Sequence, residues 1–155
     1  MTNPKEVYVE KQSIKGKRRA RKLALQALYQ WLMTQGERSA IEAQFHATND
    51  MTKVDTQYFH TLLQGVIEHR HEIETAFEAY IDRPVNELNP VELTVLRLSG
   101  FELLYCPELP YRIVLDEAVT LTKAFGSQDG HRYVNGVLNN LAKQVRKEEI
   151  NQQDG

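Results

Sequence analysis

One stretch of the sequence decides the fold: residues 89–107 read NPVELTVLRLSGFELLYCP. A helix over residues 90–105 would carry apolar side chains nearly all round, which is typical of a helix buried at the centre of a bundle. Asn89 can cap its start, Pro90 suits its first turn, and Pro107 ends it. The sequence therefore predicts an all-α protein built around this central helix.

Further helices are predicted on both sides of the central one. They are expected at residues 17–35, around residues 40–46, at residues 55–83, at residues 110–125 and from about residue 131 to residue 147. Their apolar residues recur at helical spacing. No segment alternates as a strand would, and no internal repeat is present. The pattern predicts about seven helices in two small packed bundles.

The expected domain organisation follows from where these helices begin and end. Residues 1–16 show no sustained period and are expected to form a flexible basic leader. An N-terminal helical subdomain is expected at residues 17–84, because the residue before Pro84 avoids the helical region. A C-terminal helical subdomain is expected at residues 85–148, followed by a polar tail at residues 149–155.

The net charge of -2 hides an asymmetry along the chain. Residues 1–22 hold eight Lys or Arg and two acidic residues, whereas the remaining 133 residues hold 11 basic and 19 acidic side chains. A basic segment on an acidic body indicates an anionic partner that is met at one place. The alternative is a solubilising tail without a partner.

The composition is that of a globular cytoplasmic protein. Apolar residues make up 41% of the chain and charged residues 26%, close to the globular average. A mean hydropathy of -0.51 argues against a membrane span, and the N-terminus lacks the apolar stretch of a signal peptide. Cys106 is the single cysteine, so an intramolecular disulfide is excluded, and we expect this side chain to be buried.

Motifs that carry chemistry are scarce. Residues 126–130 lack the spacing of a phosphate-binding loop and indicate a turn. The pair His71-Glu72 lacks the second histidine of a zinc-protease motif. The adjacent carboxylates of Asp116 and Glu117 would diverge on a helix, whereas a general acid–base pair must converge. We therefore expect a binding protein rather than an enzyme, with no catalytic residues, metal site, cofactor or small-molecule substrate.

The start of the first helix carries the pattern most typical of nucleic-acid binding. Arg18, Lys22 and Tyr29 are spaced so that they fall on nearly one line of a helix, away from its apolar stripe. Positive charge there opposes the helix macrodipole by about 0.3–1 kcal/mol per charge, so helix stability alone does not explain it. The cations can meet phosphates while the ring stacks on an unpaired base. Tyr29 as a half-buried packing residue is the alternative.

A second candidate patch lies in the turn and helix start that contain Gln128, Asp129, Arg132 and Tyr133. It repeats the arrangement of a cation beside an aromatic ring. A polar turn with a half-buried tyrosine would give the same pattern, so the spacing leaves both interpretations open.

Several blocks of the sequence are similar to one known family. They read KRRAR at residues 17–21, LQALYQW at 25–31, VLRL at 95–98, PYRIVLDEA at 110–118 and DGHRYVNGVL at 129–138. In this order they resemble the NusB family of bacterial transcription antitermination factors over roughly residues 17–146. The resemblance implies an all-helical fold of two small bundles.

The resemblance also implies a function and partners. Family members bind the boxA element of nascent ribosomal RNA together with NusE, a small-subunit ribosomal protein, and join the RNA polymerase antitermination complex. It implies RNA contacts at Arg18, Arg19, Arg21, Gln128, Asp129, Arg132 and Tyr133. Lys22 joins this set as part of the same basic run, although many members have an acidic residue there. For NusE the resemblance implies a contact at Glu92, with Tyr29 near that junction.

Two other hypotheses remain at this point. The same helical module forms the N-terminal domain of some ribosomal RNA cytosine methyltransferases, which need a further cofactor-binding domain that we expect a chain of 155 residues to lack. The other alternative is a scaffold protein that binds only proteins, in which the basic run is a tail without an RNA partner. The sequence leaves open self-association of the free protein, the RNA sequence recognised, the role of the leader and the full set of NusE contacts.

Overall fold

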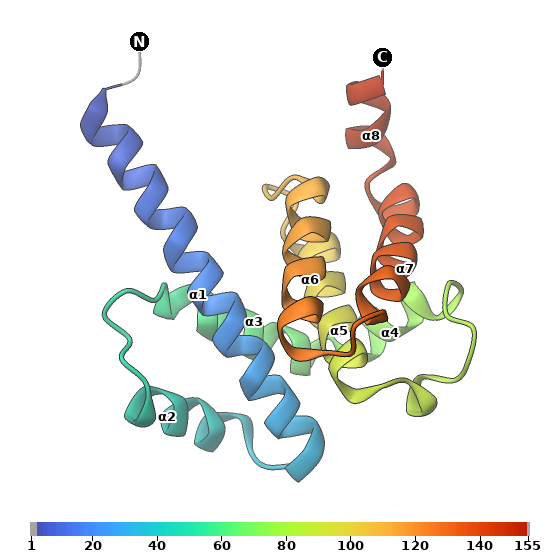
Figure 1. Ribbon diagram of the computed structural model, residues 1–155, viewed down its shortest axis with the longest axis horizontal. Helices are drawn as coiled ribbons and strands as arrows, with labels where there is room; N and C mark the ends of the chain where they lie inside the picture. Colours follow the sequence, from blue (N-terminus) through green and yellow to red (C-terminus); the bar gives the residue numbers. More distant parts are fainter. Residues whose placement is uncertain (1–2, 155) are drawn as a thin grey trace. The chain divides into compact units, whose positions relative to one another are not determined.

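The computed structural model describes residues 3–154, with the side chains of residues 8–10, 153 and 154 excepted. The described part of the chain contains eight α-helices, a short 3-10 turn and no strand (Figure 1). The helices are α1 (Pro4–Thr34), α2 (Arg38–Thr48), α3 (Thr56–Glu68), α4 (Arg70–Glu78), α5 (Pro90–Tyr105), α6 (Tyr111–Phe125), α7 (Gly130–Val145) and α8 (Lys147–Asp154), with the 3-10 turn at Val85–Glu87. This confirms the prediction of an all-α fold with about seven helices.

Helix α5 is the buried centre of the C-terminal part of the chain. Every residue from Leu93 to Leu103 is buried, with no polar face left toward solvent. Helices α4, α6 and α7 all pack against it. As predicted, Pro90 stands in its first turn, and the side chain of Asn89 accepts hydrogen bonds from the backbone N–H groups of Val91 and Glu92.

Burial of α5 also covers a charged side chain, Arg97, and this charge is paired. Its Nη2 lies 2.6 Å from Oε1 of Glu74 on α4, and its Nε donates to the same oxygen at 2.8 Å. A buried guanidinium without a partner would cost several kcal/mol. The ion pair therefore fixes α4 against α5.

The C-terminal end of α5 is closed by Arg146, which lies between α7 and α8. Its guanidinium donates to the backbone carbonyl oxygens of Leu103 at 2.9 Å and Cys106 at 3.0 Å. These are carbonyl groups that the end of a helix leaves without an intrahelical partner. Glu149 binds Arg146 at 2.6 Å and also accepts from the backbone N–H of Tyr111, so one ion pair caps the end of α5 and the start of α6.

The N-terminal part of the chain has its own small core. Ala20, Ala24 and Ala27 are fully buried, which confirms the predicted inward stripe of α1. The rings of Phe45 on α2 and Phe59 on α3 lie 6.2 Å apart. Asp55 caps α3, because its Oδ1 accepts from the backbone N–H of Tyr58 at 3.0 Å.

The two ends of the chain correct the sequence-based expectation. The expected flexible leader is helical from Pro4 onward and is continuous with the rest of α1, and residues 149–154 of the expected polar tail belong to α8. The N-terminal start has a local cause: Asn3 accepts from the backbone N–H of Lys5 at 2.9 Å, and Pro4 occupies the first turn. Both segments bury little apolar surface, so their sequences show no periodic apolar pattern from which a helix could be predicted.

The predicted single helix over residues 55–83 is also corrected. It is divided at His69, whose φ of -103° and ψ of 18° interrupt α3 and begin α4. The His69 ring stacks on Tyr105 with centroids 4.4 Å apart. The apolar period alone predicted one continuous helix, whereas the structure has a break at His69, where the side chain packs on Tyr105.

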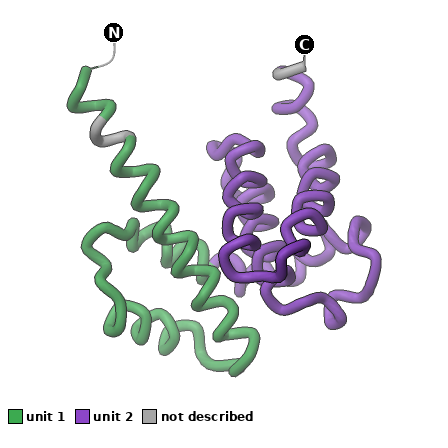
Figure 2. The backbone as a smooth tube through the Cα atoms, in the orientation of Figure 1, with its two compact units in different colours: residues 1–64 green, residues 65–155 purple. Residues whose placement is uncertain are grey.

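The chain divides into two compact units at residues 64 and 65, inside α3, and not after residue 84 as expected (Figure 2). The reason is that α4 packs with the helices that follow it. A Cβ added at Gly100 of α5 would lie 2.9 Å from Cγ2 of Ile73, which shows how closely the two helices approach. Helix α4 already ends at Glu78, before Pro84, and the boundary between the packed units lies at neither position.

Across the helices that the structure describes, none combines the length and the apolar character needed to cross a membrane.

Two helical glycines give opposite expectations for stability. A Cβ at Gly65 of α3 would overlap the ring of Phe101, whereas a Cβ at Gly136 of α7 would meet no atom within 4 Å. Gly65→Ala should lower the free energy of unfolding by about 1–3 kcal/mol through overpacking. Gly136→Ala should raise it by about 1 kcal/mol, since alanine favours a helix interior. Urea denaturation measures both, and equal shifts in the two variants would contradict this packing.

Candidate nucleic-acid interface

The basic face of α1 is built as its spacing predicts. Arg18 and Lys22 are exposed on the side away from the buried alanines. Tyr29 is 37% exposed and lies on the same helix. The helical period therefore presents two cations and a partly exposed ring along the outside of α1.

Arg19 connects this face to the loop before α3. Its Nη1 lies 3.4 Å from the carbonyl oxygen of Lys53, and both side chains are exposed. Lys53 is a cation that the sequence-based reasoning did not select. Lys17 is oriented differently, because its Nζ lies 5.3 Å from the centroid of the Tyr58 ring.

The placement of Arg21 corrects one of the expected RNA contacts. Its side chain is only 3% exposed, and its guanidinium carbon lies 5.7 Å from the centroid of the Tyr58 ring. A guanidinium over an aromatic face is attracted by the ring quadrupole. Arg21 therefore packs inside the N-terminal unit, whereas its neighbours Arg18, Arg19 and Lys22 are exposed.

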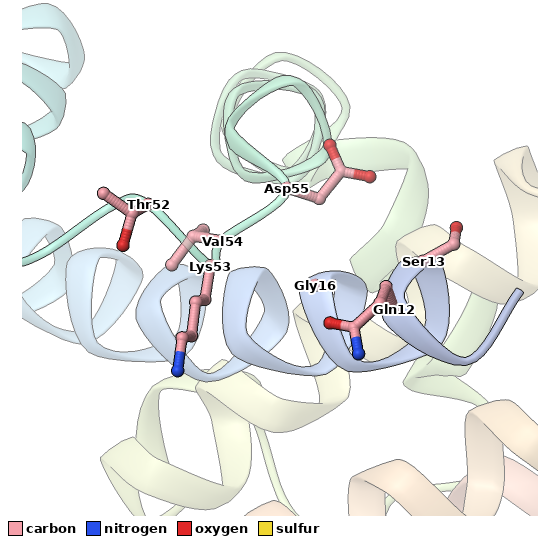
Figure 3. A pocket seen from close by; sticks show the side chains of 7 residues that line it. All are labelled: Gln12, Ser13, Gly16, Thr52, Lys53, Val54 and Asp55. Atoms are coloured by element: carbon pink, nitrogen blue, oxygen red, sulfur yellow. The ribbon is translucent and has the colours of Figure 1, made fainter. Parts of the chain in front are cut away.

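An open cleft of about 270 Å³ lies beside the basic run (Figure 3). It is lined by Gln12, Ser13, Gly16, Thr52, Lys53, Val54 and Asp55. The backbone N–H of Asp55 donates to the carbonyl oxygen of Gly16 at 3.1 Å, which holds the loop against α1. Figure 3 shows the Lys53 side chain extending from the loop across α1, so the loop adds a positive charge beside that helix.

The C-terminal unit contains a polar cluster around Tyr133. The Tyr133 hydroxyl donates to Oδ1 of Asp82 at 3.0 Å, and it also accepts from the backbone N–H of Asp82 at 3.4 Å. Arg83 binds the same carboxylate through Nε at 2.8 Å and Nη2 at 3.0 Å. The Arg83 guanidinium carbon lies 5.5 Å from the centroid of the Tyr133 ring. We call Asp82, Arg83 and Tyr133 the tyrosine cluster.

These contacts shift the pKa values of the three residues of the tyrosine cluster. The hydrogen bonds from Arg83 and then Tyr133 lower the pKa of Asp82 to about 2. The same carboxylate raises the pKa of Arg83 above its ordinary value, and partial burial raises the pKa of Tyr133. At neutral pH the cluster therefore holds an ionised carboxylate, a guanidinium and a neutral phenol.

Glu92 lies near the same end of the unit. A Cβ added at Gly130, the first residue of α7, would lie 3.2 Å from Cδ of Glu92. Partial burial raises the pKa of Glu92, an effect that the charge of Arg83 opposes. A carboxylate beside a helix N-terminus is favourable, which accounts for its position against α7.

The turn between α6 and α7 presents the remaining predicted residues. Gln128, Asp129 and Arg132 are exposed. The His131 ring nitrogen Nδ1 lies 3.0 Å from the carbonyl oxygen of Gln128, which holds the turn in place. The structure thus brings Glu92, the turn and Tyr133 to one end of the C-terminal unit. The α1 residues, Tyr29 included, belong to the N-terminal unit.

Metal-binding chemistry has no support in the described residues, among which no group of three or more His, Cys, Asp or Glu side chains could hold an ion. Cys106 is buried, as predicted.

Comparison with known proteins decides the family. The sequence model of the NusB family matches residues 18–143. The chain belongs to the NusB family. It is 62% identical over 142 residues to the transcription antitermination protein NusB of Legionella pneumophila (strain Corby), covering 92% of this chain and 97% of that protein. It is 49% identical over 149 residues to the same-named protein of Pseudomonas fluorescens (strain Pf-5), covering 96% and 90%.

Solved NusB structures share the fold. NusB of T. maritima superimposes with a TM-score of 0.76 at 27% identity, covering 87% of this chain and 96% of that chain. A chain from the crystal structure of antitermination factors NusB and NusE in complex with dsRNA gives a TM-score of 0.74 at 25% identity, covering 82% and 96%. The resemblance of the sequence blocks to the NusB family is thereby confirmed.

Three residues of this NusB-family surface were missed by sequence-based reasoning. Arg83 served there only to mark the end of a helix, Asp82 was not selected, and Lys53 lay in a loop without a motif. The contact between Asp82 and Tyr133 joins positions 51 apart in the chain. No periodicity within one segment can reveal such a pair.

The tyrosine cluster predicts an unusual titration. The folded pKa of Asp82 is about 2, below the ordinary value of about 3.9. The cluster's contribution to stability is therefore complete above about pH 4 and is lost as the pH falls through about 2. Arg83→Ala should raise this pKa more than Tyr133→Phe does, because the Arg83 hydrogen bonds are the largest cause of the shift.

Carbon-13 NMR of the aspartate carboxyl groups measures this titration. Asp50 provides the internal control, since its lowered pKa comes first from its hydrogen bonds with Thr52 and should not respond to either variant. An Asp82 midpoint near the ordinary value in the unaltered protein would contradict the cluster.

Proposed function

We propose that this chain is an RNA-binding transcription antitermination factor. In this proposal it binds the boxA element of nascent ribosomal RNA together with NusE and joins the RNA polymerase antitermination complex. The observation that carries the proposal is the 62% identity, over 92% of the chain, to a transcription antitermination protein. The structural relative crystallised with NusE and dsRNA supports both partners.

The exposed cations of α1 supply the phosphate contacts in this proposal. Arg18, Arg19 and Lys22 are exposed along α1, and Lys53 adds a fourth charge from the adjoining loop. Each phosphate that a lysine or arginine neutralises releases counterions, so binding weakens as salt rises. Arg21 contributes indirectly, because its packing on Tyr58 fixes the helix that presents the others.

The end of the C-terminal unit supplies the second group of RNA contacts. Gln128, Asp129 and Arg132 offer exposed hydrogen-bonding groups on the turn before α7 and on its first residues. The Tyr133 ring is suited to stacking on an unpaired base. These features favour a single-stranded stretch of RNA, whereas the relative was crystallised with dsRNA, so a binding test must compare the two forms of RNA.

NusE is the proposed protein partner, with Glu92 and Tyr29 as its contacts. Glu92 is half-buried and its carboxylate is partly shielded from water, so a basic or hydrogen-bonding group of the partner has a partly desolvated acceptor to bind. Tyr29 is partly exposed and can supply an aromatic anchor of the kind enriched at interfaces.

The proposal is of a binding protein without a reaction of its own, acting in the cytoplasm, where bacterial transcription takes place. The relatives are named for control of transcription. The role of the chain is to hold RNA and a partner protein together, and its surfaces supply binding groups rather than a catalytic pocket.

The test is equilibrium binding of the full chain to a labelled boxA RNA across a salt series, with and without NusE. A scrambled RNA of equal composition and a duplex form of the boxA sequence are the comparisons. We expect preference for single-stranded boxA, tighter binding with NusE, and a linear fall of log affinity with log salt. Equal affinity for boxA and scrambled RNA would contradict the proposal.

Variants assign the contacts within the same experiment. Arg18→Ala combined with Lys22→Ala should reduce the salt slope by about 1.4, or about 0.7 for each lost single-strand contact. Lys143→Ala, an exposed lysine on α7 outside the proposed set, is the control. Glu92→Gln should weaken the gain from NusE while leaving RNA binding by the chain alone unchanged. Loss of NusE binding without any change in salt slope for the α1 variant would favour a protein-only scaffold.

A further inference from the structure

The tyrosine cluster joins two segments that lie far apart in the sequence. Asp82 and Arg83 precede the 3-10 turn Val85–Glu87, whereas Tyr133 lies in the first turn of α7. The Asp82 carboxylate accepts from both partners: from Tyr133 at 3.0 Å and from Arg83 at 2.8 and 3.0 Å. One acidic side chain thus organises a ring and a guanidinium.

Stability does not account for this network. The side chains of Arg83 and Asp82 are 49% and 62% exposed. An exposed ion pair contributes little to the free energy of unfolding, because water and salt screen it and because ordering two side chains costs entropy. What the network changes is orientation: it restricts the rotation of two side chains that would otherwise be mobile at the surface.

The two oriented side chains carry the kinds of group that bind RNA, an aromatic ring and a cation. The hydroxyl hydrogen bond holds the outer end of the Tyr133 side chain beside Asp82, and the Arg83 guanidinium carbon lies 5.5 Å from the ring centroid. A guanidinium has five N–H donors, and Asp82 engages only Nε and Nη2. Within the described part of the chain, no hydrogen bond is made by Nη1 of Arg83. This nitrogen can therefore donate to a phosphate while the Asp82 pair remains intact.

The charge of Asp82 is otherwise hard to reconcile with an RNA-binding surface. A carboxylate beside a phosphate is repelled, so electrostatics alone would favour a neutral residue at this position. Pairing with Arg83 offsets that repulsion and leaves the fork of the guanidinium in a fixed direction. The Asp82 carboxylate then positions the Tyr133 ring and the Arg83 guanidinium, the two groups that would contact RNA.

We infer that Asp82 is a positioning residue that holds Arg83 and Tyr133 as one RNA-binding unit. The ring receives an unpaired base, and the guanidinium binds an adjacent phosphate. This inference rests on the proposed function and adds Arg83 to the RNA-contacting residues.

The test compares two variants of equal charge. Asp82→Ala removes the acceptor, whereas Asp82→Asn keeps one carbonyl oxygen that can accept from Tyr133 or Arg83. Glu87→Gln removes the same charge from a nearby exposed side chain outside the cluster. We expect Asp82→Ala to weaken boxA RNA binding about three- to tenfold, Asp82→Asn to recover part of that loss, and Glu87→Gln to leave affinity unchanged or slightly tighter.

Arg83 variants separate charge from geometry. Arg83→Lys keeps the charge but loses the planar fork, so it should weaken binding while keeping the salt slope. Arg83→Ala should weaken binding and reduce the slope by about 0.7. Circular dichroism melting of each variant verifies that the fold is intact, which is expected because the cluster is exposed.

The outcomes distinguish this inference from the proposed function. If the unaltered protein does not prefer boxA to scrambled RNA, the proposed function fails. If it does prefer boxA, but Asp82→Ala and Asp82→Asn both bind as Glu87→Gln does, the positioning role of Asp82 is overturned. If Arg83→Ala leaves both affinity and salt slope unchanged, Arg83 is not an RNA contact.

Discussion

Burial of α5 is the constraint on which the rest of the C-terminal unit depends. Eleven consecutive residues of this helix are removed from water, so every polar group among them needs an internal partner. Arg97 forms an ion pair with Glu74, and Arg146 donates to backbone carbonyl groups at the C-terminal end of α5. Because α4, α6 and α7 must surround the helix, its start lies beside the first residue of α7, and the candidate interface is built on that end.

The sequence was most informative where burial follows one period. The central helix was predicted from its apolar character, and its cap at Asn89 was predicted from residue type; both are present. The leader was not predicted to be helical, because an exposed helix shows no apolar stripe. The break at His69 was missed because it accompanies a ring contact with Tyr105, 36 positions along the chain, which local periodicity does not register.

In the candidate site, too, local periodicity predicted some features, whereas others depend on tertiary contacts. The exposure of Arg18 and Lys22 was predictable because the buried stripe of α1 defines the opposite face. Burial of Arg21 was not, since it depends on Tyr58 in another helix. Asp82 and Arg83 were likewise beyond local reasoning, because only the folded chain brings them to Tyr133. Local period finds the face of a helix, and tertiary structure decides which charges on or near that face are accessible.

The most direct measurement of the central claim is photochemical cross-linking of a boxA RNA to the full chain in the presence of NusE, with the cross-linked peptides identified by mass spectrometry. The account predicts cross-links in two segments, residues 17–22 of α1 and residues 128–133 at the start of α7, both suppressed by excess unlabelled boxA RNA. Cross-links confined to other parts of the chain, or unaffected by that competitor, would contradict it.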